Sequence, residues 1–246
     1  MSDLYYLYLI IAVFASCVSA LFGMGAALIL LAVGAYLFNP AESIALATII
    51  FASNTIARSI TMWRDIPWKL GIYMALLSMP FAFLGAELMP YLPTDILRKA
   101  LGILILSHIL ITWSHFQIKI GKSYPAYGAL SAVYGFLSGL LGSGNPVKAI
   151  FFHHMGFSKQ AFVGLMAISS VPANIVKLIS YQQSGLMEFI PFQVPIALIA
   201  ISLVVAFFGK YALKRIPDKS FQYGLQLVLA ISALGLIFVD PMTVIN

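Results

Sequence analysis

Three basic residues lie inside apolar segments of the sequence, and their side chains are the ones most suited to chemistry. They are Arg58, Lys148 and Lys177. A charge at the centre of a membrane span costs about 2.5 to 3.5 kcal/mol on insertion scales, so such residues usually mark a substrate or ion pathway. No acidic residue lies equally deep in an apolar segment. The three cations therefore predict a binding site for an anion.

Amide and hydroxyl side chains accompany two of these cations. Asn54 lies four residues before Arg58. Asn174 lies three residues before Lys177, so on a helix each amide shares a face with its cation. The alternative is that Arg58 and Lys177, each about one turn from a helix end, extend to the lipid headgroups. Hydroxyl groups for the same anion are carried by Ser53, Thr55, Ser169 and Ser170.

Two glycine-containing turns are expected to add backbone groups to the site. Each turn interrupts an apolar run and precedes a segment too short to span a membrane comfortably. Glycine lets backbone N–H groups turn inward where a half-helix begins, and that helix end carries partial positive charge. The residues of these turns are Gly23 and Gly25 in the first, and Gly142, Ser143 and Gly144 in the second.

The second short segment carries an extra cation. Asn145 and Pro146 begin it, and Lys148 lies in its first turn. The matching stretch of the first half, 26–29, is entirely apolar. A single added cation predicts an asymmetric site, in which a charged substrate lies off-centre.

Other small residues are expected to serve helix packing. Gly135 and Gly139 are four residues apart, and so are Ser16 and Ala20. Pairs of small residues at this spacing let two helices approach closely.

Enzyme and metal motifs are weak. Cys17 is the only cysteine, His153 and His154 are adjacent instead of four residues apart, and no zinc-peptidase motif occurs. We therefore predict no catalytic residue, metal or cofactor. An intramembrane hydrolase that uses Ser138 or Ser143 with the histidines is the least favoured alternative.

Composition places these residues in a polytopic membrane protein. Hydrophobic residues make up 61% of the 246 positions, and charged residues make up 9%, against about 25% in soluble domains. This excludes a soluble enzyme, a basic nucleic-acid-binding protein and a secreted disulfide scaffold. The net charge of +6 is then an orientation signal, because Lys and Arg gather on the cytoplasmic side.

An internal repeat organises the apolar segments. Residues 19–25 match 138–144 at an offset of 119, Asn54 matches Asn174 at 120, and Gly85 matches Gly209 at 124. We predict an all-α membrane protein of two repeats, 1–120 and 121–246, each made of a Gly-broken helical hairpin and three transmembrane helices. The predicted segments are the hairpin 4–38 with helices 42–62, 67–90 and 96–114, and the hairpin 125–157 with helices 160–181, 190–212 and 220–239.

Charge placement predicts that the two repeats are inverted. A hairpin crosses the membrane either twice or not at all, so each half makes an odd number of crossings and the second half lies upside down. Placing the loops 63–69, 115–124, 158–159 and 210–219 in the cytoplasm leaves only Arg98 and Lys99 outside. Both termini then face the periplasm. The cations on the inner side are Arg64, Lys69, Lys119, Lys122, Lys159, Lys210, Lys214, Arg215 and Lys219.

The sequence resembles the sulfite exporter TauE/SafE family over nearly its whole length. The resemblance is carried by residues 21–25 and 45–54 in the first half and by 139–146 and 163–174 in the second. It implies a carrier in the bacterial inner membrane for sulfite, sulfonates or sulfoacetate. The sulfur chemistry comes from the resemblance alone, whereas the anion site comes from the residues.

The expected mechanism is alternating access, with the anion between the two broken hairpins. An anion channel is the first alternative, because it would need the same basic lining, and a structural scaffold is the next. The partners are a small anion and the lipid bilayer, with no nucleic acid. A coupling ion, either proton or sodium, and a homo-oligomer are left open by the residues.

Overall fold

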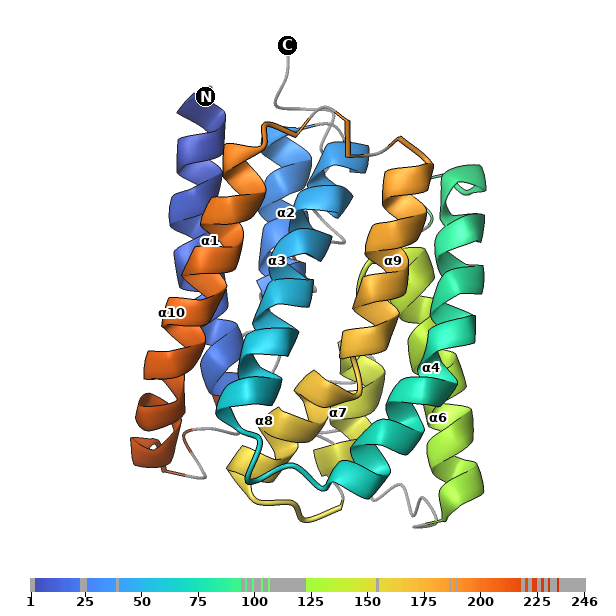
Figure 1. The fold of residues 1–246 in the computed structure, drawn as a ribbon, viewed down its shortest axis with the longest axis vertical. Helices are drawn as coiled ribbons and strands as arrows, with labels where there is room; N and C mark the ends of the chain where they lie inside the picture. Colours follow the sequence, from blue (N-terminus) through green and yellow to red (C-terminus); the bar gives the residue numbers. More distant parts are fainter. Residues whose placement is uncertain are drawn as a thin grey trace.

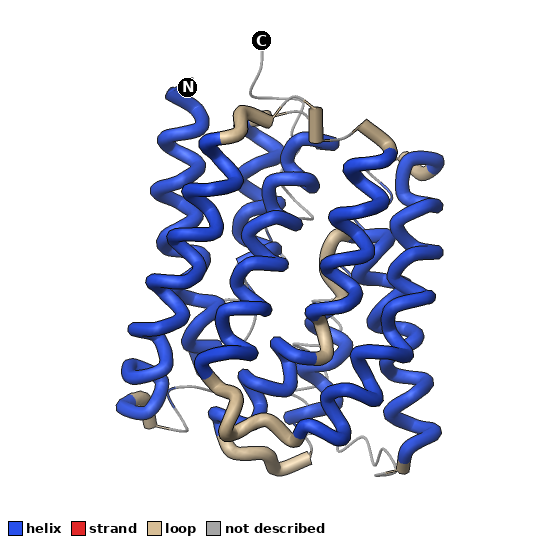
Figure 2. The backbone as a smooth tube through the Cα atoms, viewed as in Figure 1, coloured by secondary structure: helices blue, strands red, loops and turns tan. Residues whose placement is uncertain are grey.

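In the computed structural model the chain is a bundle of helices (Figures 1 and 2). Every regular element among the described residues is helical. The structure describes residues 3–22, 26–38, 40–93, 123–153, 155–185, 187–188 and 190–217, with isolated positions between 96 and 106 and between 220 and 234. The predicted helices 96–114 and 220–239 fall almost entirely outside these residues, as do Gly23 and Gly25.

The described helices begin and end at local signals in the sequence. Apolar runs set the helix lengths, and a proline, a glycine or a polar loop marks most of the ends. The helices are α1 (Asp3–Phe22), α2 (Ala26–Leu37), α3 (Pro40–Thr61), α4 (Trp68–Leu88), η1 (Met89–Tyr91), α6 (Tyr124–Leu141), α7 (Asn145–His153), α8 (Lys159–Ile168), α9 (Val171–Gln183) and α10 (Gln193–Arg215).

Five helical stretches of the described chain are long and apolar enough to cross a membrane. The short helices α2 and α7, of 12 and 9 residues, are shorter than the roughly 20 residues that a span requires. Each follows a longer helix, as the predicted hairpins require. The candidate spans are Asp3–Phe22, Ser43–Thr61, Trp68–Leu88, Lys159–Gln183 and Gln193–Arg215.

The predicted helix 160–181 is wrong in one respect, because it is broken at Ser169 and Ser170 into α8 and α9. Pro172 lies in the first turn of α9. Proline has no N–H to donate and its ring displaces the carbonyl four residues earlier, so a continuous helix cannot pass through it undisturbed. Figure 2 shows that loop segments lie inside the bundle as well as at its ends.

Glycines hold α4 and α6 in close contact. A Cβ atom on Gly135 would lie 2.2 Å from the carbonyl oxygen of Ser78, and one on Gly139 would lie 2.2 Å from that of Ala82. From the opposite helix, a Cβ on Gly85 would lie 2.2 Å from the oxygen of Phe136. The expected packing role of the Gly135 and Gly139 pair is therefore confirmed.

Ser16 and Ala20, the corresponding pair in the first half of the sequence, have different roles. Ala20 packs against Gly209 of α10, where an added Cβ would lie 2.5 Å from that of Ala20. Ser16 instead accepts a hydrogen bond from Asn54. Thus α1 packs against α10 through Ala20, while Ser16 faces the polar interior.

Two links between helices and two helix ends lie at one end of the bundle. Figure 1 places there the link from α3 to α4, the start of α6, the link from α7 to α8 and the end of α10. The starts of α1 and α10 and the end of α4 lie at the opposite end. The described parts of the loops that the charge pattern groups on one side therefore share one end of the molecule.

Candidate anion site

The three cations singled out by the sequence are buried. Arg58 is 1% exposed, and Lys148 and Lys177 are 0% exposed. Their side chains therefore end inside the protein, and the alternative that Arg58 and Lys177 extend to the lipid headgroups does not describe the structure. A buried cation requires hydrogen-bond partners and a compensating charge.

Arg58 binds the end of the first hairpin helix. Its Nη1 donates to the carbonyl oxygen of Ser19 at 2.8 Å, and its Nε donates to that of Asn54 at 3.1 Å. Ser19 lies in the last turn of α1, where carbonyl groups lack helical partners and carry partial negative charge. The Nη2 atom of Arg58 has no hydrogen-bond partner among the described residues. One edge of the guanidinium is therefore left for a ligand.

Lys177 makes the equivalent contact in the second half. Its Nζ donates to the carbonyl oxygen of Gly142 at 3.0 Å and lies 5.4 Å from the centre of the Phe51 ring. Gly142 follows the last residue of α6 and has a φ of +74°, a left-handed conformation that glycine adopts readily. A cation on α3 and a cation on α9 thus each contact the C-terminal end of a helix, α1 and α6 respectively.

The turn at Gly142 also presents a backbone carbonyl to a cation. The predicted contribution was a backbone N–H directed at an anion, whereas the structure shows the Gly142 carbonyl directed at Lys177. Gly144 is needed for close approach, because a Cβ there would lie 2.6 Å from the carbonyl oxygen of Tyr134. The turn therefore brings the start of α7 close to α6 beside a cation, and the N–H contacts predicted for it stay a prediction.

Lys148 is held by the break between α8 and α9. Its Nζ donates to the carbonyl oxygen of Met166 at 3.2 Å, to the Ser169 hydroxyl at 3.0 Å and to the Ser170 hydroxyl. The same atom lies 3.6 Å from the centre of the Tyr134 ring, which is a favourable cation–π distance. Since these three hydrogen bonds match the three N–H groups of the ammonium, an anion near Lys148 has to compete with the serines.

The side-chain amide of each asparagine joins two helices. Asn54 Nδ2 donates to Ser16 Oγ at 3.1 Å, which joins α3 to α1. Asn174 Nδ2 donates to Thr55 Oγ1 at 3.1 Å, which joins α9 to α3. Ser53 is half-buried, and its hydroxyl donates to the carbonyl oxygen of Ile49 in its own helix.

Several buried polar atoms around the cations have no hydrogen-bond partner among the described residues. Native proteins pair most buried polar groups, so a local excess of unpaired ones indicates a ligand site. Most of these atoms are donors suited to an oxyanion, and the two amide oxygens are acceptors. The unpaired atoms are Arg58 Nη2, Ser19 Oγ, Tyr134 Oη, Ser138 Oγ, Ser143 Oγ, Asn145 Oδ1 and Asn174 Oδ1.

The charges of these groups interact with one another. The charges of Arg58 and Lys177 both act on Lys148, and Arg58 also acts on the Tyr134 hydroxyl. The buried polar side chains of the described chain include these three cations and no carboxylate. Like charges repel strongly in a low-dielectric interior, so an anion among them would relieve that repulsion.

Tyr134, Ser19 and Ser16 are site residues that the sequence did not bring out. Tyr134 shares a face of α6 with Ser131 and Ser138, and all three are buried. A row of hydroxyl groups on the same face as the packing glycines was the available signal. This row of hydroxyl groups is easily overlooked, because the packing glycines on the same face already explain why that face is buried.

The family comparison covers residues 8–236, which match the model for the sulfite exporter TauE/SafE. This chain belongs to the TauE/SafE family. No curated protein and no solved structure matches it significantly. TauE/SafE proteins are membrane transporters and not enzymes, so the hydrolase alternative is excluded. Membership implies a transported anion, and this TauE/SafE protein contains a buried basic cluster that suits one.

Removing the hydroxyls around Lys148 is expected to destabilise the protein. The double variant Ser169→Ala/Ser170→Ala should lower the free energy of unfolding by about 2 kcal/mol or more, because a buried charged donor loses two acceptors. The matched control is Ser202→Ala, since Ser202 is also fully buried and also donates to the carbonyl four residues earlier, and its hydrogen bond among the described residues involves no cation. Thermal unfolding in detergent measures the stability of both variants. If the double variant and Ser202→Ala lose equal stability, the two serines do not stabilise the buried charge of Lys148.

Proposed function

We propose that this TauE/SafE protein is a secondary transporter that moves a small sulfur-containing oxyanion across the bacterial inner membrane by alternating access. The anion is of the sulfite, sulfonate or sulfoacetate class. The observation that carries the proposal is the cluster of Arg58, Lys148 and Lys177, which is fully buried, lacks a described carboxylate and is surrounded by unpaired donors. Family membership supplies the sulfur chemistry.

Arg58 is proposed to make the most directional contact with the anion. Its Nη2 is buried and has no partner in the described part of the chain, and a planar guanidinium suits sulfonate oxygens better than an ammonium does. Lys177 and Lys148 supply further positive charge, and the hydroxyls of Tyr134 and Ser143 complete the donor set. Lys148 lacks a counterpart in the first half, so the anion is placed off the axis that relates the halves.

Two inverted repeats would support alternating access. The contact of Arg58 with the end of α1 resembles that of Lys177 with the end of α6, and the two cations are separated by the same 119 residues as the glycine turns. In addition, α4 of the first half packs on α6, and α10 of the second half packs on α1. Each half thus braces the hairpin of the other, and rocking one half would move both cations relative to each other.

Transport in liposomes tests this proposal. Purified protein should exchange radiolabelled sulfite or sulfoacetate in a saturable manner with unlabelled anion on the other side. Flux that instead follows voltage at channel-like rates would identify an anion channel. Imposed proton and sodium gradients show which ion, if either, is coupled. A panel of sulfite, sulfoacetate, taurine, thiosulfate and sulfate in thermal-shift measurements identifies the ligand, because binding to the folded state raises its stability.

Cysteine labelling tests the proposed inverted topology, in which both termini are periplasmic. Single cysteines at positions 121 and 187, in a Cys17→Ala background, are expected to react with an impermeant reagent from opposite sides of the membrane. Position 121 should be cytoplasmic and position 187 periplasmic, because cations favour the cytoplasmic side. Labelling of both positions from the same side would contradict this topology.

A further inference from the structure

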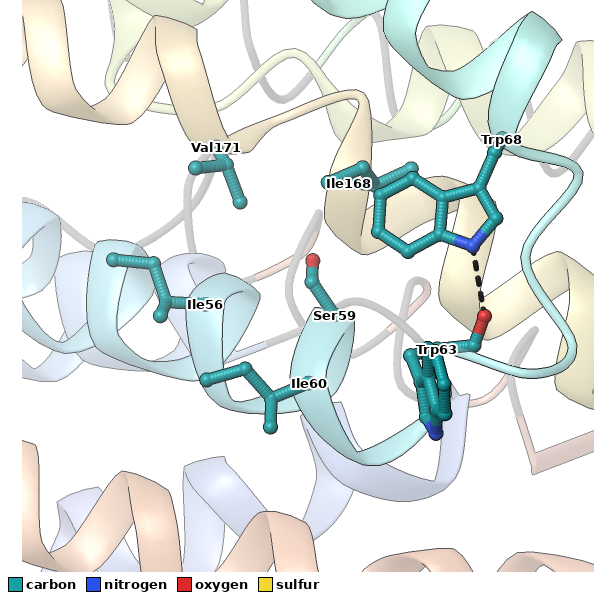
Figure 3. A pocket seen from close by; sticks show the side chains of 7 residues that line it. All are labelled: Ile56, Ser59, Ile60, Trp63, Trp68, Ile168 and Val171. Carbon is teal, nitrogen blue, oxygen red and sulfur yellow. Dashed lines mark hydrogen bonds between the residues drawn. The ribbon is translucent and has the colours of Figure 1, made fainter.

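An apolar groove opens on the outer surface of the bundle, apart from the anion site. It has a volume of about 500 Å³ and lies between the end of α3, the start of α4 and the junction of α8 with α9. Figure 3 shows its lining side chains. Ile60 is 63% exposed here. The residues that line the groove are Ile56, Ser59, Ile60, Trp63, Trp68, Ile168 and Val171.

Two tryptophans stand at one end of this groove. The Trp68 indole N–H donates to the carbonyl oxygen of Trp63 at 2.8 Å (Figure 3). This bond fixes one indole beside the other at the link between α3 and α4. Tryptophan is enriched at the level where lipid headgroups meet the acyl chains. The tryptophan end of the groove therefore marks the membrane interface, and the isoleucines extend from it towards the bilayer interior.

Basic residues flank the tryptophan end. The Arg64 guanidinium lies 5.7 Å from the centre of the Trp63 ring, and Lys69 directly follows Trp68. Both cations are exposed, as is Asp65 between them, so the link keeps a net positive charge. An apolar groove with a cationic rim is complementary to a lipid whose headgroup is an anion. A small hydrophilic anion would gain little from this lining, in which Ser59 is the only residue without an aliphatic or aromatic side chain.

We propose that this groove binds an anionic phospholipid. One acyl chain lies along Ile56 and Ile60, the indoles of Trp63 and Trp68 lie at the level of the glycerol, and Arg64 and the neighbouring Lys69 bind the phosphate. A zwitterionic lipid makes the same apolar contacts but gains less from the cations. The groove adjoins Ile168, one residue before the break that holds Lys148. Lipid occupancy therefore lies beside the part of the protein that contacts the anion site.

Quenching of tryptophan fluorescence by brominated lipids tests the proposal. The chain has three tryptophans, so the variant Trp113→Phe leaves Trp63 and Trp68 as the only reporters. The protein is reconstituted in mixtures of phosphatidylglycerol and phosphatidylcholine, with one or the other brominated on its acyl chains. We expect brominated phosphatidylglycerol to bind with a preference of about fivefold, because Arg64 and Lys69 with Asp65 leave a net charge of +1, and one basic residue near an anionic lipid contributes about this factor.

Two variants, each of which lacks two exposed cations, show whether the preference depends on the charges beside the groove. Arg64→Gln/Lys69→Gln should reduce the preference to about one, whereas Lys214→Gln/Arg215→Gln removes two exposed cations at the end of α10 and should leave it unchanged. A parent protein that shows no preference would overturn the proposal. The same holds if the first variant keeps the preference, or if both variants lose it equally. The test uses no transport assay, so its result is independent of the transported anion.

Discussion

Exchanging Arg58 or Lys177 for methionine is expected to weaken binding of the transported anion by about 100-fold or more and to abolish measurable exchange. Removing one partner of a buried ion pair costs about 3 to 5 kcal/mol, and 1.4 kcal/mol corresponds to a factor of ten. Methionine keeps much of the apolar volume of each chain and removes its charge. Thermal-shift titrations and liposome exchange with the same anion measure the two effects.

The stability of the ligand-free variants separates binding from a structural role. Each methionine removes a hydrogen bond to a helix end, at Ser19 or Gly142, but also removes the unfavourable burial of a charge. A buried charge without a counter-charge costs much free energy, and no buried carboxylate faces these cations among the described residues, so the variants should unfold at the same temperature as the parent or higher.

Lys214→Met is the control for this first prediction, because Lys214 is exposed in the last turn of α10. It should leave binding and exchange unchanged. Variants of Arg58 and Lys177 that bind and transport like the parent would show that the site assignment is wrong. If these variants bind the anion normally but unfold at a much lower temperature, the two cations instead have a structural role at the helix ends.

Substituting alanine at Gly135 or Gly139 is expected to disrupt the contact between α4 and α6. The new Cβ would lie 2.2 Å from a backbone carbonyl oxygen of α4 in either case, and a backbone atom cannot rotate away. The helices must separate along their length, so we expect a loss of about 3 kcal/mol or more in the free energy of unfolding, at the upper end of overpacking effects. The amount of monodisperse protein and its unfolding temperature in detergent measure this loss.

Gly128→Ala on the same helix is the matched control. A Cβ at this position would meet the hydroxyl end of the Tyr73 side chain at 3.1 Å, and that side chain can move by a few tenths of an ångström. The control should unfold within about 1 kcal/mol of the parent, because glycine in a helix is itself less favourable than alanine. Equal destabilisation at Gly128 and Gly139 would show that helix separation is not the cause.

Helix positions were predictable because their signals are local. The apolar run and the glycine turn before Asn145 define the hairpin of α6 and α7 within a few residues of its observed bounds. The break at Ser169 and Ser170 was missed although Pro172 was visible in the sequence. Hydropathy continues unchanged across it, and a proline in a membrane helix bends or breaks the helix depending on what the neighbouring helices offer the freed carbonyls.

The anion site was predictable in its charges but not in its contacts. Burial of Arg58, Lys148 and Lys177 followed from their positions in apolar segments. The partners did not, because each lies on a different helix: Arg58 meets Ser19 39 residues away, and Lys177 meets Gly142 35 residues away. Residue type cannot tell which carbonyl will face a cation across a bundle.

The sequence by itself determined that this is a helical membrane protein with buried cations and broken hairpins, since hydropathy, glycine and proline act on neighbouring residues. Only the tertiary structure decided that Tyr134 and the serines of a broken helix surround Lys148, and that two helix ends receive the other cations. Those contacts depend on how the helices pack, and packing is set by the summed fit of many side chains along each interface. The binding chemistry is therefore encoded locally, while its geometry is a property of the whole bundle.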